Sequence, residues 1–328
     1  MLFDDSPASS LTGIARLAAR SPVLEAKAQV QYFEIETRSV LNRTKPGMPF
    51  RWTINPYRGC EFACRYCYAR YTHEFMGIED VTRFENQIYA KSDLAPILRH
   101  ELRRTPLQDP IAIGTATDPY QPAERRFRRT RSVLEVLAAG QGRRISITTK
   151  SDLVTRDIDL LRRIAEGNIV SVNMTVTTLD RDLARILEPR APRPDLRLAS
   201  VRKLADAGIR TGVFPNPIMP MITDSAMRLD QLAAAAREHG ASYFGGGLLF
   251  LMPAARRVFF PFLAQHYPEL LKKYEDRYTR NAYLRGGYVE MIRRRVDAIR
   301  DRHGFTEAPY EYLPSPVEPE QPALFQIN

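Results

Sequence analysis

The sequence predicts an α/β protein built on a partial (β/α)6 barrel with a helical C-terminal extension. Between residues 51 and 250, short apolar segments alternate with segments of helical periodicity, and six such units fit in this span. The short segments are apolar on both faces, which is typical of strands in a parallel sheet covered by helices. Six units suit an open barrel better than two separate domains. With 44% hydrophobic residues, the 328-residue chain can bury a sizeable core.

The individual strands and helices are predicted from the periodicity of apolar residues and from the glycines and prolines that end them. Strands are expected at 51–56, 111–114, 144–149, 169–177, 211–214 and 241–250. Helices are expected at 68–78, 93–103, 130–139, 158–166, 196–207 and 225–239. In a barrel of parallel strands, functional side chains gather at the carboxyl ends of the strands. One mouth is therefore expected to collect the loop of Cys60 and the residues that end the later strands, which are Thr117, Asp118, Lys150, Ser151, Thr177, Asp180 and Asn216.

Four regions are expected along the chain. Residues 1–50 are polar and should wrap the outside of the core, and residues 51–254 should form the barrel. Residues 255–312 should form a basic helical extension, since 270–303 contain ten Lys and Arg against five Asp and Glu. Residues 313–328 are rich in proline and are expected to be an extended tail.

The net charge and the positions of the cysteines indicate which partners and which cellular compartment to expect. The formal net charge of +10 favours polyanionic partners, although a basic composition can equally serve solubility. All three cysteines lie between residues 60 and 67, which suits a metal site in a reducing compartment better than a disulfide framework. We therefore expect a cytoplasmic protein. No apolar run reaches the length of a membrane span, and the first residues do not resemble a secretory signal.

The cysteine loop contains the most specific pattern in the chain. Cys60, Cys64 and Cys67 are separated by three and then two residues, so their thiolates can hold one face of an iron–sulfur cube. A cube has four irons, and three cysteines leave one iron open for a substrate or cofactor. The alternative is a structural zinc site, for which His73 is the candidate fourth ligand at an unusual spacing.

This pattern, placed after the first strand of a partial barrel, resembles the radical S-adenosylmethionine (SAM) superfamily. The flanking segments NPYRGC and GTATDPYQPAE resemble its spore photoproduct lyase-like branch. The resemblance implies a [4Fe–4S] cluster on Cys60, Cys64 and Cys67 as the catalytic centre, with SAM chelating the fourth iron. It implies reductive cleavage of SAM to a 5′-deoxyadenosyl radical that attacks a substrate, with the electron coming from a donor such as flavodoxin or ferredoxin.

The resemblance also suggests residues that bind the cofactor. Tyr66 stands where the superfamily contacts adenine, and the segment ending in Thr117 and Asp118 stands where it holds the methionine amino group. Further candidates end later strands: Lys150 or Arg190 for the cofactor carboxylate, Glu188 for the ribose hydroxyls, and Asn216. Asp118 can equally be a turn residue before a proline, and each of the later residues can equally be an ordinary loop or surface group.

The substrate is expected to be DNA or RNA, because both the resemblance to the lyase-like branch and the excess of Lys and Arg over Asp and Glu favour a nucleic acid. The arginines at 125–131 are candidates for phosphate contact, and Arg293 to Arg295 form a second basic cluster. The later tyrosines could stack on bases but are expected instead to pack the last helices on the barrel; they are Tyr274, Tyr278, Tyr283 and Tyr288. The chain has no fourth cysteine to return a hydrogen atom to a repaired product, so Tyr57, Tyr68 or Tyr120 would have to do so. Two alternatives remain open: radical modification of a peptide or small metabolite, and a non-enzymatic, zinc-bound nucleic-acid-binding module.

Overall fold

The computed structural model describes residues 12–21, 23–26 and 30–306, and its centre is a sheet of seven strands. Six strands run parallel in chain order, and the short β3 (Leu41–Arg43) adds antiparallel to the first. The six are β4 (Trp52–Ile54), β7 (Ile111–Ile113), β8 (Arg144–Thr149), β9 (Ile169–Thr175), β10 (Arg210–Phe214) and β11 (Tyr243–Phe244). The predicted α/β class with a parallel sheet is confirmed.

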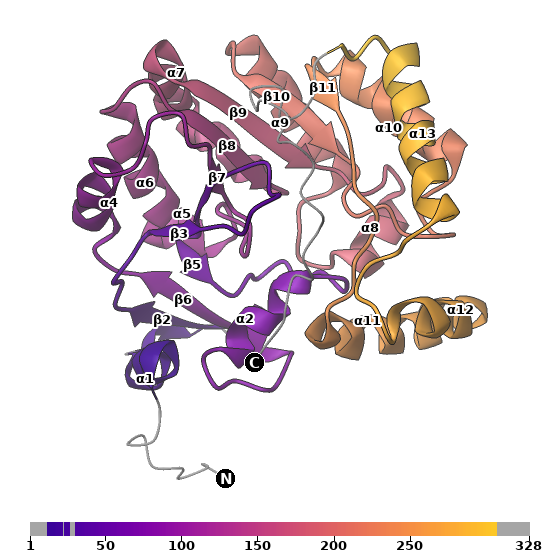
Figure 1. The fold of residues 1–328 in the computed structure, drawn as a ribbon, viewed down its shortest axis with the longest axis horizontal. Coiled ribbons are helices and arrows are strands. Elements are labelled where there is room, and N and C mark those ends of the chain that lie inside the picture. Colours follow the sequence, from indigo (N-terminus) through magenta and orange to yellow (C-terminus); the bar gives the residue numbers. More distant parts are fainter. Residues whose placement is uncertain (1–11, 22, 27–29, 307–328) are drawn as a thin grey trace.

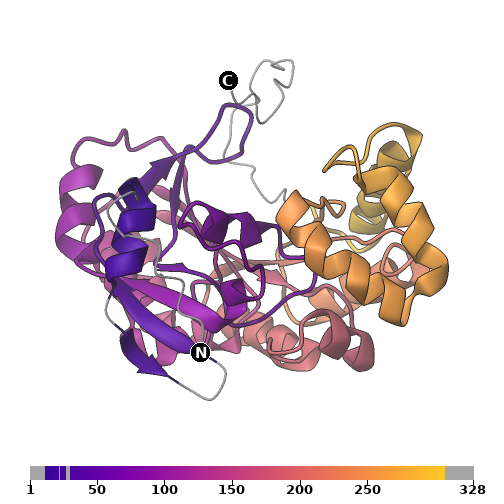
Figure 2. The same ribbon diagram turned by 90° about the horizontal axis from the view of Figure 1, so that it is seen from below.

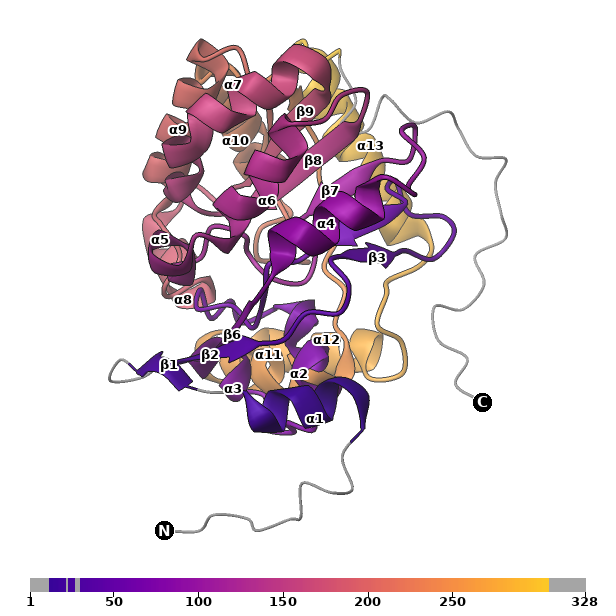
Figure 3. The ribbon, with the colours of Figure 1, turned by 90° about the vertical axis from the view of Figure 1, so that its left-hand side faces the viewer.

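Helices cover the outer face of this sheet (Figures 1 and 3). The longer ones are α4 (Leu94–Leu102), α6 (Arg129–Ala138), α7 (Ile158–Gly167), α9 (Pro194–Asp206) and α10 (Ala226–Glu238). Shorter turns are α5 (Ala123–Phe127), η2 (Asp152–Asp157) and α8 (Arg181–Leu187). Buried aliphatic side chains of the strands and of these helices form the main core. In β8 and β9 apolar residues alternate with small polar ones, and these polar side chains, such as Ser146, Ser171 and Asn173, are buried as well, so both faces of the sheet are covered.

A second, four-stranded sheet was not predicted from the sequence. Its order is β1-β2-β6-β5, from β1 (Val23–Ala26), β2 (Gln31–Ile35), β6 (Gln87–Lys91) and β5 (Tyr57–Arg58). The helices α1 (Gly13–Arg20) and α3 (Arg83–Asn86) lie beside it. Part of the N-terminal 1–50 segment is thus built into a sheet, and β5 leads directly into the cysteine loop.

The C-terminal helices lie at the opposite end of the molecule from α1 (Figure 2). The helices α11 (Pro253–His266) and α12 (Pro268–Tyr278) pack together, and α11 contacts the short η1 (Tyr68–Arg70) and α2 (Tyr71–Glu74) that follow the cysteines. As expected, Tyr274 and Tyr278 pack these helices, since both are fully buried. The last helix, α13 (Gly287–Arg302), packs on α10. The proline-rich tail predicted at 313–328 lies outside the described residues.

Several expected elements are shorter than predicted. The helix expected at 68–78 is divided into η1 and α2, and the strand expected at 241–250 extends only over Tyr243–Phe244. Three glycines, residues 245–247, follow that strand. Because glycine weakens a strand interior, the regular strand ends there, and Leu248 then forms an isolated bridge with Ile218, which lies outside the named strands. No helix in the described ranges has the length and apolarity needed to cross a bilayer.

Candidate active site

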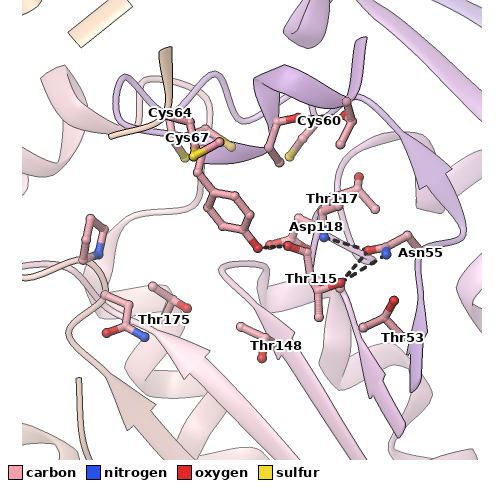
Figure 4. A pocket seen from close by; sticks show the side chains of 18 of the residues that line it. Thr53, Asn55, Cys60, Cys64, Cys67, Thr115, Thr117, Asp118, Thr148 and Thr175 are labelled. Atoms are coloured by element: carbon pink, nitrogen blue, oxygen red, sulfur yellow. Dashed lines mark hydrogen bonds between the residues drawn. The ribbon is translucent and has the colours of Figure 1, made fainter. Parts of the chain in front are cut away.

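A cavity of about 740 Å³ opens at the carboxyl ends of the parallel strands, between them and the cysteine loop. Figure 4 shows the sulfurs of Cys60, Cys64 and Cys67 on one wall and hydroxyl side chains of the strand ends, including Thr148 and Thr175, facing them. The three cysteines are free thiols. The topology has therefore brought one loop and several separate strand ends to a single mouth, which is where parallel barrels place their chemistry.

The cysteine loop is held by backbone and side-chain contacts on both sides. The Cys60 N–H donates to the carbonyl of Phe84 at 3.0 Å, and Arg70 donates to the carbonyl of Cys64 at 3.1 Å. Arg70 is itself fully buried and forms an ion pair with Glu85. A buried guanidinium that is tied to both a carboxylate and the loop fixes the loop's shape without any bound group.

The glycine before the first cysteine is required by the backbone. Gly59 has φ +80°, and a Cβ placed there would lie 2.7 Å from the carbonyl of Gln87. Its own carbonyl accepts from Thr117 Oγ1 at 2.6 Å and from Gln121 Nε2 at 3.1 Å, while Gln121 Oε1 accepts from the Glu61 N–H at 2.9 Å. The segment after β7 thus fastens the cysteine loop, and this is the contact the structure gives Thr117.

Asn55 joins the first and second parallel strands at the cavity floor. Its side-chain oxygen accepts from the Ala116 N–H at 2.8 Å, and its amide donates to Thr115 Oγ1 at 3.1 Å (Figure 4). Tyr68 Oη donates to the carbonyl of Thr115 from the cysteine side. Thr115 belongs to the segment expected to hold the methionine amino group, whereas Asn55 and Gln121 were not predicted as site residues. Their places in the segments NPYRGC and GTATDPYQ, which follow strands, could have indicated them.

Asp118 lies on the cavity and is already hydrogen-bonded within the protein. It accepts from Thr149 Oγ1 at 2.6 Å, from the Lys150 N–H at 2.7 Å and from the Tyr120 N–H at 2.9 Å. Burial raises the pKa of Asp118, and these hydrogen bonds oppose that rise. The carboxylate therefore ties the β7 loop to the end of β8, the turn role considered for it, while its place on the cavity keeps it within reach of a bound ammonium.

Tyr66 and Glu188 form part of a buried polar network behind the cysteines. Tyr66 Oη and Thr177 Oγ1 both donate to Glu188, the latter at 2.7 Å, and Arg197 pairs with Glu188 at 2.5 Å. Burial alone would raise the pKa of Glu188, but the charges of Arg197 and Lys150 hold it below its usual value. Tyr66 lines the cavity and Glu188 does not. In this structure the Glu188 carboxylate is thus engaged with Tyr66, Thr177 and Arg197, and its expected contact with the ribose stays a prediction.

Lys150 and Asn216 both reach the cavity. The Lys150 ammonium lies 5.7 Å from the centre of the Tyr66 ring. Burial lowers the pKa of Lys150, yet the negative charges of Cys64 and Glu188 outweigh burial, so its pKa is raised. Asn216 Oδ1 accepts from the Gly247 N–H at 2.7 Å. Arg190, the other cation considered, does not line the cavity and donates instead to Glu85 and Asn86 near α3.

The donor set fits an iron–sulfur cluster better than zinc. His73 is buried with Nε2 3.0 Å from the carbonyl of Gln87, and burial lowers its pKa to about 4. Within the described ranges, no histidine lines the cavity and no three His, Cys, Asp or Glu side chains converge tightly enough for one metal ion. A single zinc needs its donors around one point, whereas a cube binds each thiolate through a different iron. Burial raises the pKa of Cys64 to about 12.

The basic cluster at 125–131 is mostly engaged in ion pairs. Arg129 pairs with Glu34 at 2.5 Å, and Arg131 pairs with Asp157 at 2.6 Å and with Asp159 at 3.0 Å. These arginines fasten α6 to its neighbours and do not line the cavity. The structure therefore does not support phosphate contact by Arg129 and Arg131.

Comparison with known proteins agrees with this geometry. The family model of the radical SAM superfamily matches residues 54–233, more than half of the chain. The chain belongs to the radical SAM superfamily. An uncharacterized protein of Mycobacterium bovis, Mb2609c, is 37% identical to this radical SAM enzyme over 98% of the chain and 93% of the relative. The family implies a [4Fe–4S] cluster and SAM as cofactors.

Solved structures of spore photoproduct lyase share the fold. A point mutant of that lyase superposes with a TM-score of 0.63 and the lyase complexed with dinucleoside spore photoproduct with 0.62. Each is 18% identical, and each comparison covers 83% of this chain and 79% of the other. At this identity the likeness concerns the arrangement of the barrel, which is the partial barrel described above.

Proposed function

We propose that this radical SAM enzyme holds a [4Fe–4S] cluster on Cys60, Cys64 and Cys67, cleaves SAM reductively beside it, and acts on a nucleic acid. The observation that carries the proposal is the position of three free thiols on one wall of a cavity whose opposite wall is the carboxyl edge of a parallel sheet. When bound, the cluster and SAM supply a 5′-deoxyadenosyl radical, given one electron from a reductant.

The protein's own residues orient the cofactor and exclude water. Lys150 is a cation beside the cysteine wall and suits the cofactor carboxylate, while the Asp118 carboxylate suits the amino group. Tyr66 presents its ring to the cavity with its hydroxyl fixed by Glu188, so the ring can stack on a purine without moving. Asn216 and the hydroxyl of Thr175 provide hydrogen-bonding groups at the strand ends.

Three features support a nucleic-acid substrate. The structural neighbours include a lyase complexed with a dinucleoside photoproduct, and the chain carries a net charge of +10. An aromatic row of Tyr68, Phe250 and Tyr283 lines the cavity, with ring centres 4.8 Å and 5.1 Å apart. Tyr283 was expected to be packed among the last helices, but it lies at the end of this row and is 42% exposed. Such a row can stack on unpaired bases in a sequence-tolerant way.

Tyr68 is the best-placed hydrogen donor among the three tyrosines considered. It lines the cavity next to Cys67, with its hydroxyl on the carbonyl of Thr115. Tyr57 also lines the cavity, but its hydroxyl donates to the buried Glu124, and Tyr120 is fully buried and does not line the cavity. We infer that Tyr68 returns a hydrogen atom to the product if the reaction requires one.

The direct test is anaerobic reconstitution with iron and sulfide, followed by reaction with SAM and dithionite as the electron donor, using oligonucleotides deuterated in the base or sugar. The proposal predicts deuterium in 5′-deoxyadenosine for at least one labelled oligonucleotide. A matched reaction with a labelled peptide should transfer none. If cofactor cleavage neither couples to nor is altered by any nucleic acid, the substrate half of the proposal is wrong. One bound zinc without iron or sulfide would refute the whole proposal.

A further inference from the structure

The cavity has a second cationic wall, away from Lys150, that the proposed cofactor contacts do not use. Lys91, at the end of β6, and Arg58, at the end of β5, both line the cavity. They belong to the four-stranded sheet, whereas Lys150 follows β8 of the parallel sheet. Lys91 is only 6% exposed, so its ammonium is held at this wall and not in bulk solvent.

Neither cation has a carboxylate partner within the described part of the chain. Other buried cations in this protein do: Arg70 pairs with Glu85, and Arg197 pairs with Glu188. No ion pair or side-chain hydrogen bond joins Lys91 to any described residue, and the buried Nε of Arg58 has no acceptor there. A buried, unpaired cation is costly, and a protein keeps one where a ligand supplies the opposite charge.

The charged groups near Lys91 do not neutralise it, which leaves a ligand to supply the negative charge. Glu101 is the carboxylate whose field reaches Lys91, but it is already bonded to Ser39 and to the N–H groups of Val40 and Leu41, the last at 2.8 Å. Burial, followed by the charge of Arg58, lowers the pKa of Lys91 to about 7. An oxyanion bound by the two cations would offset both the burial of the Lys91 ammonium and its repulsion by Arg58.

We propose that Arg58 and Lys91 form a subsite that binds a backbone phosphate of the nucleic-acid substrate inside the reaction cavity. This inference rests on the proposed function and adds to it how the substrate is anchored. Lys150 then binds the cofactor carboxylate beside the cysteines, whereas Arg58 and Lys91 bind the phosphodiester next to the reacting nucleotide. A single phosphate held at a fixed distance from the cysteine wall would set which nucleotide reaches the reactive end of the cofactor.

Binding of two dinucleotides to the full chain reconstituted with its cluster and SAM tests the subsite. One is thymidine dinucleotide with its single phosphodiester, and the other carries an uncharged methylphosphonate in its place. The wild type should bind the charged form about ten-fold or more tightly, since a hydrogen bond to a charged group contributes that much. Lys91→Met should reduce this preference to within about two-fold, and Lys91→Arg should retain most of it. Lys203→Met, which removes an exposed lysine on α9, is the matched control and should leave the preference unchanged.

The outcomes separate the subsite from the proposed function. If the wild type prefers the charged dinucleotide and Lys91→Met keeps that preference, the subsite is wrong while a nucleic-acid substrate still stands. If Lys91→Met instead weakens SAM binding and leaves the preference intact, the pair serves the cofactor and the subsite is again refuted. If the wild type binds neither dinucleotide nor any longer oligonucleotide, the nucleic-acid proposal fails together with the subsite.

Discussion

Replacing Lys91 by Met should stabilise the protein, and the gain should fade as pH rises. Burial and the charge of Arg58 lower the pKa of Lys91 from 10.5 to about 7. Between these values the unfolded chain binds more protons than the folded one, so the wild-type protein gains stability with rising pH. Methionine is similar in length and carries no proton. The free energy of unfolding of the variant should therefore lack this gain.

The size of the stability difference follows from the gap between the pKa of Lys91 in the unfolded chain and in the folded protein. At 1.36 kcal/mol per pH unit, the gap between about 7 and 10.5 corresponds to about 5 kcal/mol of penalty, fully present below pH 7. Most of it is relieved by pH 10, so the difference between variant and wild type should shrink by about 3 kcal/mol from pH 7 to pH 10. These figures are of the order of magnitude expected for one buried ammonium.

Urea unfolding followed by circular dichroism at pH 6, 7, 8, 9 and 10 measures this difference directly. Every other titrating group is shared by the two proteins and cancels in the comparison. Lys203→Met, at an exposed position on α9, should show a difference that stays flat with pH. If Lys91→Met is less stable than the wild type at pH 6, or if its difference does not change with pH, the ammonium has a partner and the reasoning about the unpaired wall is wrong.

Three further predictions test the site's construction. Lys150→Met should weaken SAM binding about ten-fold or more by loss of a charged contact, while Lys203→Met should not; equal binding in calorimetry would exclude Lys150 from the cofactor site. Glu188→Gln should lower the unfolding free energy by about 3 to 5 kcal/mol because it leaves Arg197 buried without its partner, and a change below about 1 kcal/mol would contradict the buried pair. Gly114→Ala should cost about 2 to 4 kcal/mol in urea unfolding, because φ is +88° and a Cβ would lie 2.5 Å from Pro119; an unchanged midpoint would show that the loop can relax.

Much of the parallel sheet could be predicted because its strands are covered on both faces. The segments at 144–149 and 169–177 are short, rich in β-branched residues and bounded by helical segments, and they became β8 and β9. The four-stranded sheet could not be predicted in this way. Its strand Gln87–Lys91 has a buried lysine at its end, and β5 has only two residues, so neither shows a strand-like pattern. Their pairing depends on tertiary contact, which local sequence does not encode.

The candidate site was predictable where chain order alone brings residues together. Cys60, Cys64 and Cys67 share one loop, and Asp118 and Lys150 end strands that parallel pairing aligns at one edge. The role of Glu188 was not predictable, because its distance from the cavity depends on Arg197, a helix residue that draws the carboxylate into the interior. Lys91 was missed for a similar reason: it lies on the unpredicted sheet, and only the fold brings it to the cavity.

The central claim is that three thiols hold an iron–sulfur cluster at which SAM is cleaved. Its most direct test is the iron and sulfide content, together with 5′-deoxyadenosine formation, of anaerobically reconstituted Cys64→Ala. Ser146→Ala, a small change at a buried position of β8 outside the cavity, is the control. The account predicts that Cys64→Ala keeps its circular dichroism spectrum but loses the cluster and at least about 99% of SAM cleavage, a barrier change of about 3 kcal/mol, while Ser146→Ala keeps both. Full cleavage by Cys64→Ala would contradict it.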